Sequence, residues 1–388
     1  MERRRGHTVG TAPRLTPLDR VFLRRACELA ERGRGSTSPN PSVGAVFARG
    51  ATTLGEGYHH MRGEAHAEVE ALRDAARRGS DVTASTLYVT LEPCNHTGLT
   101  PPCSEAVVAA RVERVVVGTA DPNPRTAGAG FARLRAAGIV VDVAGDPWSR
   151  SLIEDFERAA GRTRPYVRLK LAASLDGYVA PRPGERYWLT GEATKAYVRE
   201  LRATYDAVLV GAGTVRADDP QLTVRPPRAR RTPYRRVVAC ERGPLPAERA
   251  IFAPADGYAP TIVLAPSGRR TAFASLAARA EVVYVGPEDA GTLDLEAALD
   301  ALRARGIASV LCEGGPTLAA QLVGRGLVDR VDWFVAPVVL QGRTAVPALA
   351  NHNGASALHF DRVEQFGPDV LLSAAFATGD GRAACSAD

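Results

Sequence analysis

The chain has 388 residues, more than most single domains contain, which predicts two hydrophobic cores. Its composition, 45% hydrophobic and 24% charged, excludes wholesale disorder and fibrous repeats, and no apolar run reaches the roughly 18 residues of a membrane helix. The net charge of +6 comes from interleaved basic and acidic residues with only 6% aromatics, so we expect a small molecule as partner rather than nucleic acid or a membrane. A modest positive surplus suits a phosphorylated substrate.

The two ends and the cysteines set further limits. Residues 1–16 contain three consecutive arginines with no apolar core behind them, so we expect a disordered tail rather than a secretory signal, and a frayed tail at 381–388. The six cysteines are spread too widely for a disulfide framework, and only Cys94 and Cys103 are close in sequence. These features predict a cytoplasmic protein.

The first part of the chain predicts alternating helices and strands. Thr16 and Pro17 are typical of a helix start, and the apolar spacing that follows predicts an end near Gly33. The next expected elements are strands at 43–47 and up to Tyr58, a helix at 66–78, a strand at 87–90, a helix from about Cys103 and a strand at 115–118. This alternation predicts an α/β sandwich in a domain that spans residues 17–147.

The second part of the chain also predicts alternating strands and helices. A polar, mostly helical connector is expected at 148–164, and an apolar strand from Tyr166 opens a second α/β domain at 165–380. Its candidate strands are 166–171, 207–210, 237–239, 261–264, 282–285, 309–312 and 331–338. The Pro- and Arg-rich segments 225–235 and 243–257 are expected to be surface loops.

The most informative motif is His66 with Glu68 two positions later, followed by Cys94 and Cys103. One imidazole and two thiolates give three zinc ligands, which leaves the fourth position of a catalytic site to water. Water on zinc ionises near neutral pH, and a carboxylate that is not a ligand must carry the proton, a role that fits Glu68. This order is typical of zinc deaminases, although there two residues separate the cysteines and here eight do.

Four other interpretations of this motif stay open at this point. The histidine and cysteines could be ordinary helix and core residues. A closed structural zinc site would need a fourth ligand, for which His96 is the nearest candidate. The chain could also be a deaminase of nucleosides or nucleic acid, or a binding protein that zinc only stabilises. The deaminases would release ammonia from cytidine or single-stranded DNA, and the binding protein would tolerate Glu68→Gln.

With these residues in view, the chain resembles the bifunctional riboflavin-biosynthesis deaminase/reductase family. In this family a three-layer, cytidine-deaminase-like domain precedes a dihydrofolate-reductase-like domain, and the resemblance covers about residues 18–375. In the first domain it rests on segments 39–44, 55–59, 66–68, 90–94, 100–103 and 121–124. The eight residues between the two cysteines are characteristic of the family.

For the first domain, the resemblance implies zinc-dependent deamination of 2,5-diamino-6-ribosylamino-4(3H)-pyrimidinone 5′-phosphate. It makes His66, Cys94 and Cys103 the zinc ligands and Glu68 the catalytic proton carrier. It also implies that the substrate pocket is lined by Asn40, His59 and Asp121. From the residues alone, these three fit equally well as a turn residue, a strand-end side chain and a turn cap.

In the second domain the resemblance rests on segments 170–177, 184–190, 202–225 and 312–318. A glycine turn after a strand lets the backbone approach a phosphate, and the first amides of a following helix can hold a pyrophosphate. The resemblance implies reduction of the ribosyl group to a ribityl chain by NADPH, in a homodimer or homotetramer. It assigns catalysis to Lys170 and Asp218, cofactor contacts to Ala172, Trp188, Thr214, Asp218, Gly315, Pro316, Thr317, Leu318, Ala319, Ala320 and Gln321, and substrate contacts to Arg186, Arg202, Leu222, Arg225 and Glu313.

The chain departs from the family pattern at three positions. Leu99 and Ala129 stand where relatives carry basic residues, and Arg186 stands where they usually carry serine. A cation facing a phosphate contributes roughly 1.5–3 kcal/mol. Either Arg62 or Arg125 replaces the missing contact, or the chain is a paralogue whose pyrimidine substrate differs, for example by lacking the phosphate.

Overall fold

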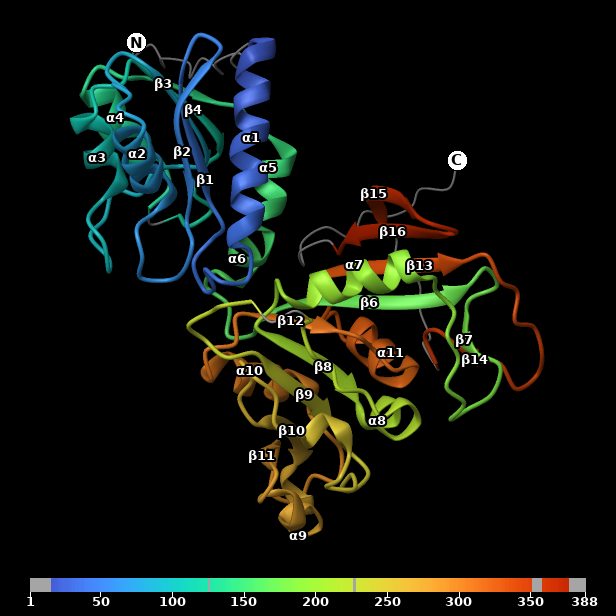
Figure 1. The fold of residues 1–388 in the computed structure, drawn as a ribbon. Coiled ribbons are helices and arrows are strands. Elements are labelled where there is room, and N and C mark those ends of the chain that lie inside the picture. Colours follow the sequence, from blue (N-terminus) through green and yellow to red (C-terminus); the bar gives the residue numbers. More distant parts are fainter. Residues whose placement is uncertain (1–14, 125, 226–227, 351–357, 377–388) are drawn as a thin grey trace, which may run out of the picture. The chain divides into compact units, whose positions relative to one another are not determined.

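The computed structural model describes residues 15–124, 126–225, 228–350 and 358–376. The chain forms two compact units, Met1–Ala160 and Gly161–Asp388, and each contains its own main sheet (Figure 1). Nearly all of the tail expected at 1–16, and all of that expected at 381–388, lie outside the described residues. Within the described ranges, no helix has the length and apolar character required to cross a membrane.

The first unit is built on a sheet with the strand order β2-β1-β3-β4-β5. β1 pairs antiparallel with β2 and β3, whereas β3, β4 and β5 run parallel. The strands are β1 Gly44–Arg49, β2 Thr52–Tyr58, β3 Thr86–Leu91, β4 Arg114–Thr119 and β5 Val140–Val143. The helices are α1 Pro17–Gly33, α2 Ala67–Arg77, α3 Cys103–Ala109, α4 Ala129–Ala136, α5 Pro147–Leu152 and α6 Glu154–Ala159.

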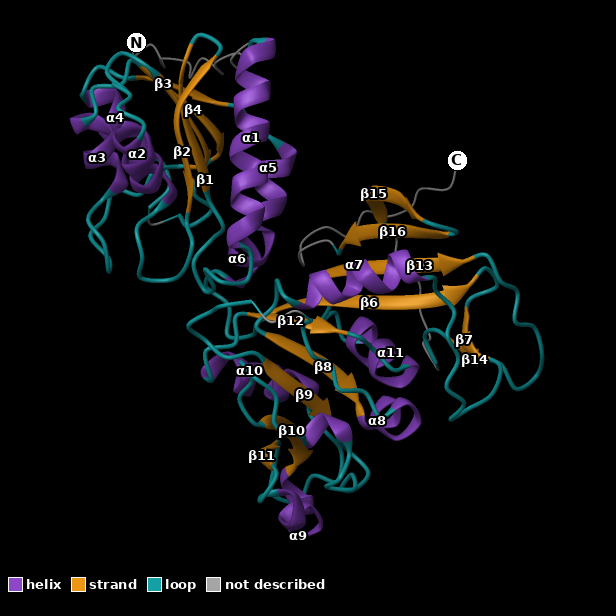
Figure 2. Ribbon diagram, in the orientation of Figure 1, coloured by secondary structure: helices purple, strands orange, loops and turns teal. Residues whose placement is uncertain are grey.

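Helices cover both faces of this sheet (Figure 2). α1 begins as expected, because Thr16 and Asp19 form a capping box around its N-terminus, and it packs one face through Phe22 and Ala26. α2, α3 and α4 share a core on the other face. The result is a three-layer unit in which α2 and α3, the helices that begin beside the zinc-motif residues, lie on the same side of the sheet.

Two glycines of β2 bring α2 unusually close to the sheet. A Cβ atom at Gly55 would lie 2.4 Å from the carbonyl oxygen of Ala71, and one at Gly57 would lie 2.5 Å from the amide nitrogen of the same residue. Any larger residue would therefore push the helix away from the strand. This close packing fixes the height of α2, and hence of His66 and Glu68, above the sheet.

The second unit contains a nine-stranded sheet with the order β11-β10-β9-β8-β12-β6-β13-β16-β15. The strands from β11 to β13 run parallel, and β16 and β15 complete the sheet as an antiparallel hairpin. The strands are β6 Tyr166–Ser174, β8 Ala207–Gly211, β9 Arg235–Ala239, β10 Thr261–Pro266, β11 Ala280–Val285, β12 Ser309–Cys312, β13 Arg330–Ala336, β15 His359–Phe366 and β16 Asp369–Ala375. A separate two-stranded sheet joins β7 Tyr178–Ala180 to β14 Val346–Pro347.

Helices also cover both faces of the nine-stranded sheet. α10 and α11 pack on one face through residues such as Leu299 and Leu318. On the other face, Val198 of α7 packs against Phe334 and Leu371, and α8 belongs to a neighbouring core. The helices are α7 Glu192–Arg202, α8 Ala212–Asp218, α9 Arg270–Phe273, α10 Leu295–Ala304 and α11 Pro316–Gly324, with short 3-10 turns η1 Ala250–Phe252, η2 Ser267–Arg269 and η3 Ala274–Leu276.

The mixed α/β class and the predicted strands are confirmed, whereas several elements were not predicted. β5, the β7–β14 pair and the β15–β16 hairpin have no counterpart in the sequence-based expectation. The segments expected to be surface loops are partly buried, because Ile251 and Phe252 pack into a core and Tyr234 is covered. Apolar side chains inside these Pro- and Arg-rich segments explain the difference.

Candidate active sites

The three expected zinc ligands meet in the first unit. His66 caps the N-terminus of α2, Cys103 is the first residue of α3, and Cys94 lies in the loop after β3. Nδ1 of His66 lies 3.1 Å from Sγ of Cys103 and 3.6 Å from Sγ of Cys94, and all three ligand atoms lie within 4.8 Å of one another. A zinc ion, which binds nitrogen and sulfur at about 2.0–2.3 Å, fits this donor set.

The geometry favours an open zinc site over a closed one. In the part of the chain that the structure describes, His96 does not belong to the cluster, which leaves three protein ligands. Hydrogen bonding from Cys103 lowers the pKa of the Cys94 thiol to about 4, and the same contact raises the pKa of Cys103. The pair therefore carries a thiolate on Cys94, the form that binds metal.

Glu68 follows two residues after His66 and is buried, with 3% of its surface exposed. Burial, together with the charge of Cys94, raises the pKa of Glu68 to about 7. A carboxyl group with such a pKa can both accept and donate a proton near neutral pH. Glu68 therefore has the position and the acidity of a proton carrier beside the zinc ligands.

Asn40 and His59 lie next to this cluster. Burial lowers the pKa of His59, so its ring is neutral, donates from Nδ1 to the carbonyl oxygen of Ala65 and leaves Nε2 as an acceptor 3.4 Å from the Asn40 amide. The ring also meets that of His66 edge-on at 5.1 Å. His59 thus links Asn40 to a zinc ligand.

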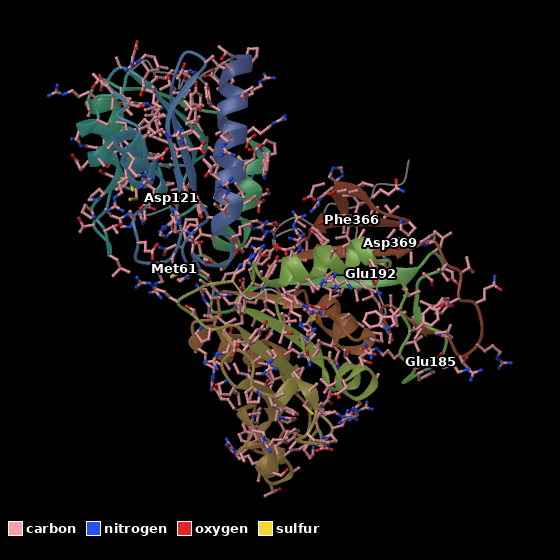
Figure 3. All side chains as sticks on the ribbon, in the orientation of Figure 1. Met61, Asp121, Glu185, Glu192, Phe366 and Asp369 are labelled. Atoms are coloured by element: carbon pink, nitrogen blue, oxygen red, sulfur yellow. The ribbon has the colours of Figure 1, made fainter. Side chains whose placement is uncertain are left out.

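Asp121 occupies a turn at one end of the first unit. Met61 lies at the same end (Figure 3). Its carboxylate accepts hydrogen bonds from the amide of Asn123 and the hydroxyl of Thr126, as a turn cap does. Its own amide donates to Glu92. The structure therefore shows the turn-cap role directly, and a contact between Asp121 and substrate stays a prediction.

Glu92 is a residue to which the sequence motif assigned no role. Its buried carboxylate accepts hydrogen bonds from the amides of Asp121, Gly128, Gly130 and Phe131. Glu92 thereby ties the start of α4 and the Asp121 turn to the strand that leads to the zinc ligands. Its position two residues before Cys94 was the only signal in the sequence.

The positions that depart from the family pattern are exposed. Leu99 has 78% of its surface exposed, and Ala129 is exposed at the start of α4. Of the two arginines that could replace the missing cations, Arg62 is exposed and Arg125 lies outside the described residues.

The second unit contains a cavity of about 1340 Å³. It is lined by most of the residues expected to bind cofactor or substrate: Lys170, Ala172, Arg186, Trp188, Arg202, Thr214, Asp218, Leu222, Arg225, Glu313, Gly315, Pro316, Thr317, Leu318 and Gln321. Ala319 and Ala320 are not part of this lining, because they lie on the buried side of α11. Cations that the sequence did not single out also line the cavity, among them Arg182, Lys195, Arg199, Arg216 and Arg242.

The cavity lies at the carboxyl ends of β8, β9 and β12. At the end of β12, Gly314 and Gly315 have φ of 82° and 92°, and a Cβ atom at Gly315 would lie 2.8 Å from the hydroxyl oxygen of Thr214. These glycines lead directly into α11, whose first residues, Pro316 to Leu318, line the cavity. Such a turn before a helix N-terminus is suited to a pyrophosphate.

Charged side chains gather beside this turn. Arg202 and Glu313 form a two-pronged ion pair, and burial lowers the pKa of Lys170, an effect that Glu313 opposes. Burial also raises the pKa of Asp218, although Arg186 acts against it. Lys170 and Asp218 can therefore exchange protons more readily than exposed side chains of the same kinds.

Trp188 lies on the wall of the cavity with 63% of its surface exposed. Arg186 and Lys195 each lie 4.7 Å from its ring, within the range of a cation–π contact. The indole is therefore oriented by two cations, one from its own segment and one from α7.

A known protein family matches each of the two units. Residues 17–119 match the cytidine and deoxycytidylate deaminase zinc-binding region, and residues 165–372 match the RibD C-terminal domain. The riboflavin biosynthesis protein RibD of Escherichia coli K12 is 38% identical over 372 residues, which cover 91% of this chain and 98% of that protein.

The chain belongs to the RibD family. RibD of Bacillus amyloliquefaciens is 36% identical over 92% of this chain and 96% of its own length. Among solved structures, Acinetobacter baumannii RibD, form 1, has a TM-score of 0.76 at 36% identity and covers 93% of this chain and 99% of its own. A Thermotoga maritima structure described as a diaminohydroxyphosphoribosylaminopyrimidine deaminase/5-amino-6-(5-phosphoribosylamino)uracil reductase has a TM-score of 0.80 at 32% identity, with 93% and 99% coverage.

These matches confirm the two-domain α/β architecture, a deaminase domain followed by a reductase domain. As a RibD-family member, the chain is a bifunctional enzyme of riboflavin biosynthesis that uses zinc and NADPH. Nothing in the comparisons supports a paralogue with a changed substrate or a nucleic-acid deaminase.

Proposed function

We propose that the first unit hydrolyses the 2-amino group of 2,5-diamino-6-ribosylamino-4(3H)-pyrimidinone 5′-phosphate to a carbonyl and releases ammonia. The observation that carries this proposal is the cluster of His66, Cys94 and Cys103 with Glu68 buried beside it. Zinc held by the three ligands supplies Lewis-acid activation of water. Glu68 accepts the proton that the attacking water loses and delivers it to the leaving amino group. Asn40, His59 and Asp121 orient the pyrimidine.

We propose that the second unit reduces the ribosyl group of the deaminated product to a ribityl chain. NADPH bound in this cavity would supply a hydride to C1′, the bond from C1′ to the ring oxygen would break, and the ring oxygen would take up a proton. Lys170 and Asp218 hold this proton, while Arg202, Arg225 and Glu313 bind the sugar and its phosphate, with Arg186 and Leu222 nearby. The cavity lining and the Arg202–Glu313 ion pair support this assignment.

The adenosine end of NADPH is proposed to lie over β8 and β9. Arg216 follows β8 and donates a hydrogen bond to the carbonyl oxygen of Gly243, in the turn after β9 that also carries Arg242. Both arginines line the cavity and can face the 2′-phosphate that distinguishes NADPH from NADH. Arg242→Ala is expected to raise the KM for NADPH about tenfold and to change that for NADH little. Equal changes with both cofactors would refute this assignment.

The remaining partner assignments are also proposals. We infer that the enzyme acts in the cytoplasm on a small molecule and not on nucleic acid, as a homodimer or homotetramer. The edge strand β15, which exposes Phe360 and Val363, is an apolar surface that a second copy could cover. Light scattering on the purified chain will give the oligomeric state.

The decisive experiment follows the two activities separately. The purified protein, loaded with zinc, is incubated with the diaminopyrimidinone phosphate with and without NADPH, and ammonia and NADPH consumption are measured. We expect ammonia in both samples and NADPH consumption that follows ammonia release. Ammonia from cytidine or single-stranded DNA instead, or a preference for the dephosphorylated substrate, would contradict the proposed substrate.

A further inference from the structure

One wall of the reductase cavity is a segment without helix or strand. Residues 182–190, between β7 and α7, all line the cavity, and Trp188 is among them. A wall of this kind has no backbone ladder of its own to fix its shape, so its position depends on where its two ends are attached. One end is Gly191, which immediately precedes α7.

Asp369, the first residue of β16, holds that end. Its Oδ2 accepts a hydrogen bond from the amide of Gly191 at 2.9 Å and another from the hydroxyl of Thr194 at 2.6 Å. Asp369 is 1% exposed and Thr194 is fully buried. No side chain of α7 caps the helix, so a carboxylate 178 residues away in sequence does so (Figure 3).

The start of α7 and the turn before β16 are in van der Waals contact at this point. A Cβ atom at Gly191 would lie 3.6 Å from the Pro368 ring and 3.7 Å from Oδ2 of Asp369. The β15–β16 turn thus fits against the start of α7 by its backbone as well as by its carboxylate. A change at Asp369 is therefore transmitted to the first turn of α7.

That first turn leads to the cavity. Lys195, one residue after Thr194, lies 4.7 Å from the Trp188 ring, and Arg202 at the other end of α7 pairs with Glu313. Lys195, Val198, Arg199 and Arg202 all line the cavity. The start of α7 therefore sets the position of the cationic side chains that face cofactor and substrate.

The carboxylate of Asp369 accepts fewer hydrogen bonds than its two oxygens can. Its second oxygen, Oδ1, is buried and has no hydrogen-bond partner among the described residues. An ordinary helix cap does not require such burial. An exposed serine or aspartate would stabilise α7 without the desolvation cost of a buried carboxylate. The negative charge also opposes the burial that lowers the pKa of Lys170. A buried carboxylate in this place fits a reductase site that requires a fixed geometry and a fixed electric field.

We propose that Asp369 is a positioning residue of the reductase site. Through Gly191 it fixes the end of the 182–190 wall, and through Thr194 it fixes the first turn of α7. Trp188 and Lys195 are thereby held in one arrangement against the cofactor. The proposal rests on the proposed reductase function of the cavity.

The test compares Asp369→Ala, Asp369→Asn and Thr194→Val in the full-length, zinc-loaded chain. Asp369→Ala is expected to raise the KM for NADPH by about tenfold to a hundredfold, because small displacements of positioning groups have effects of this size. The rate of deamination in the same chain should not change. Asp369→Asn keeps one acceptor oxygen and should restore most of the affinity, and Thr194→Val should lie in between.

Asp361→Ala, which removes an exposed ion pair to Arg330 in the same hairpin and away from α7, is the matched control and should leave both KM and kcat unchanged. A wild-type KM for NADPH in Asp369→Ala, or a fall in kcat with no change in KM, would overturn the proposal. If Asp369→Ala fails to fold, a wild-type KM for NADPH in Thr194→Val would overturn it. Failure of the wild-type chain to consume NADPH would count against the proposed function. The part of the tryptophan fluorescence quenched by NADPH that is lost in Trp188→Phe reports binding at this wall independently.

Discussion

At the residue scale, the candidate zinc site depends on opposing effects on the pKa of Glu68. The side chain lies in the first turn of α2, where the helix dipole favours a carboxylate, yet burial and the Cys94 charge raise its pKa to about 7. The same carboxyl group can therefore take up a proton and release it within one catalytic cycle. An exposed glutamate would stay ionised and would be a poor donor.

Glu68→Gln should lower the rate of deamination by about 10²–10⁴-fold, the usual contribution of a general acid–base group. The amide keeps the shape of the side chain but cannot carry the proton, so bound zinc and NADPH-dependent reduction should be unchanged. Glu70→Gln, on the same helix, is the control. Metal analysis and ammonia release check the prediction, and a variant that deaminates normally would assign the proton transfer to another residue.

The pKa of a second carboxyl group, that of Asp19, is shifted in the opposite direction. Burial alone would raise its pKa, but hydrogen bonds from Arg114, from the Thr16 amide and from Tyr88 outweigh burial and lower the pKa to about 2. The folded-state pKa lies below the unfolded value, so this contribution to stability is present above about pH 4 and is lost as pH falls toward 2.

The predicted contribution of the Asp19 charge is about 2 kcal/mol at neutral pH. Asp19→Asn should therefore lower the free energy of unfolding at pH 7, and the difference between variant and wild type should shrink between pH 4 and pH 2. Denaturant titrations over this range measure it. A difference that does not depend on pH would show that the capping hydrogen bonds, not the charge, stabilise this corner of the unit.

At the element scale, the distance between α2 and β2 decides whether the zinc site forms. The helix touches the strand at Gly55 and Gly57, where no side chain intervenes. Glu92 supplies a second attachment, since it gathers the amides at the start of α4 beside the loop that carries Cys94. The ligands are thus held by contacts between elements rather than by one rigid loop.

Gly57→Ala should lower the free energy of unfolding by about 1–3 kcal/mol, the usual cost of forcing extra volume into a packed core. The new methyl group would meet the backbone of α2 and displace His66 and Glu68, so deamination should fall while reduction continues. Gly98→Ala, where a Cβ atom has nothing within 4 Å, is the matched control. Equal stability of the two variants would show that α2 can shift without cost.

At the scale of the whole molecule, the two activities belong to units with separate cores and separate sheets. The zinc ligands all come from the first unit, and the residues that line the reductase cavity all come from the second. Neither set of catalytic groups includes a residue of the other unit, so loss of one chemistry need not affect the other.

Removal of zinc by a chelator should therefore abolish ammonia release but leave NADPH consumption with the deaminated product as substrate. Removal of zinc also leaves the Cys94–Cys103 pair without its metal, so the melting temperature of the first unit should fall. Calorimetry with and without chelator, together with both activity assays, tests this. Parallel loss of both activities would indicate that the reductase unit requires the metal-bound first unit.

The sequence by itself determined the family and the strands predicted from it, and it supplied the proposed zinc ligands and the proposed proton carrier. These are local properties: a histidine, a glutamate and two cysteines at fixed spacing already define the donor set, and apolar runs define strands. The tertiary structure alone decided that Glu92 anchors α4, that Ala319 and Ala320 face the core, and that Asp369 caps α7. Each of these facts depends on contacts between segments that are distant in sequence. The residue type shows that a carboxylate can accept hydrogen bonds, but it does not show which amide will donate them.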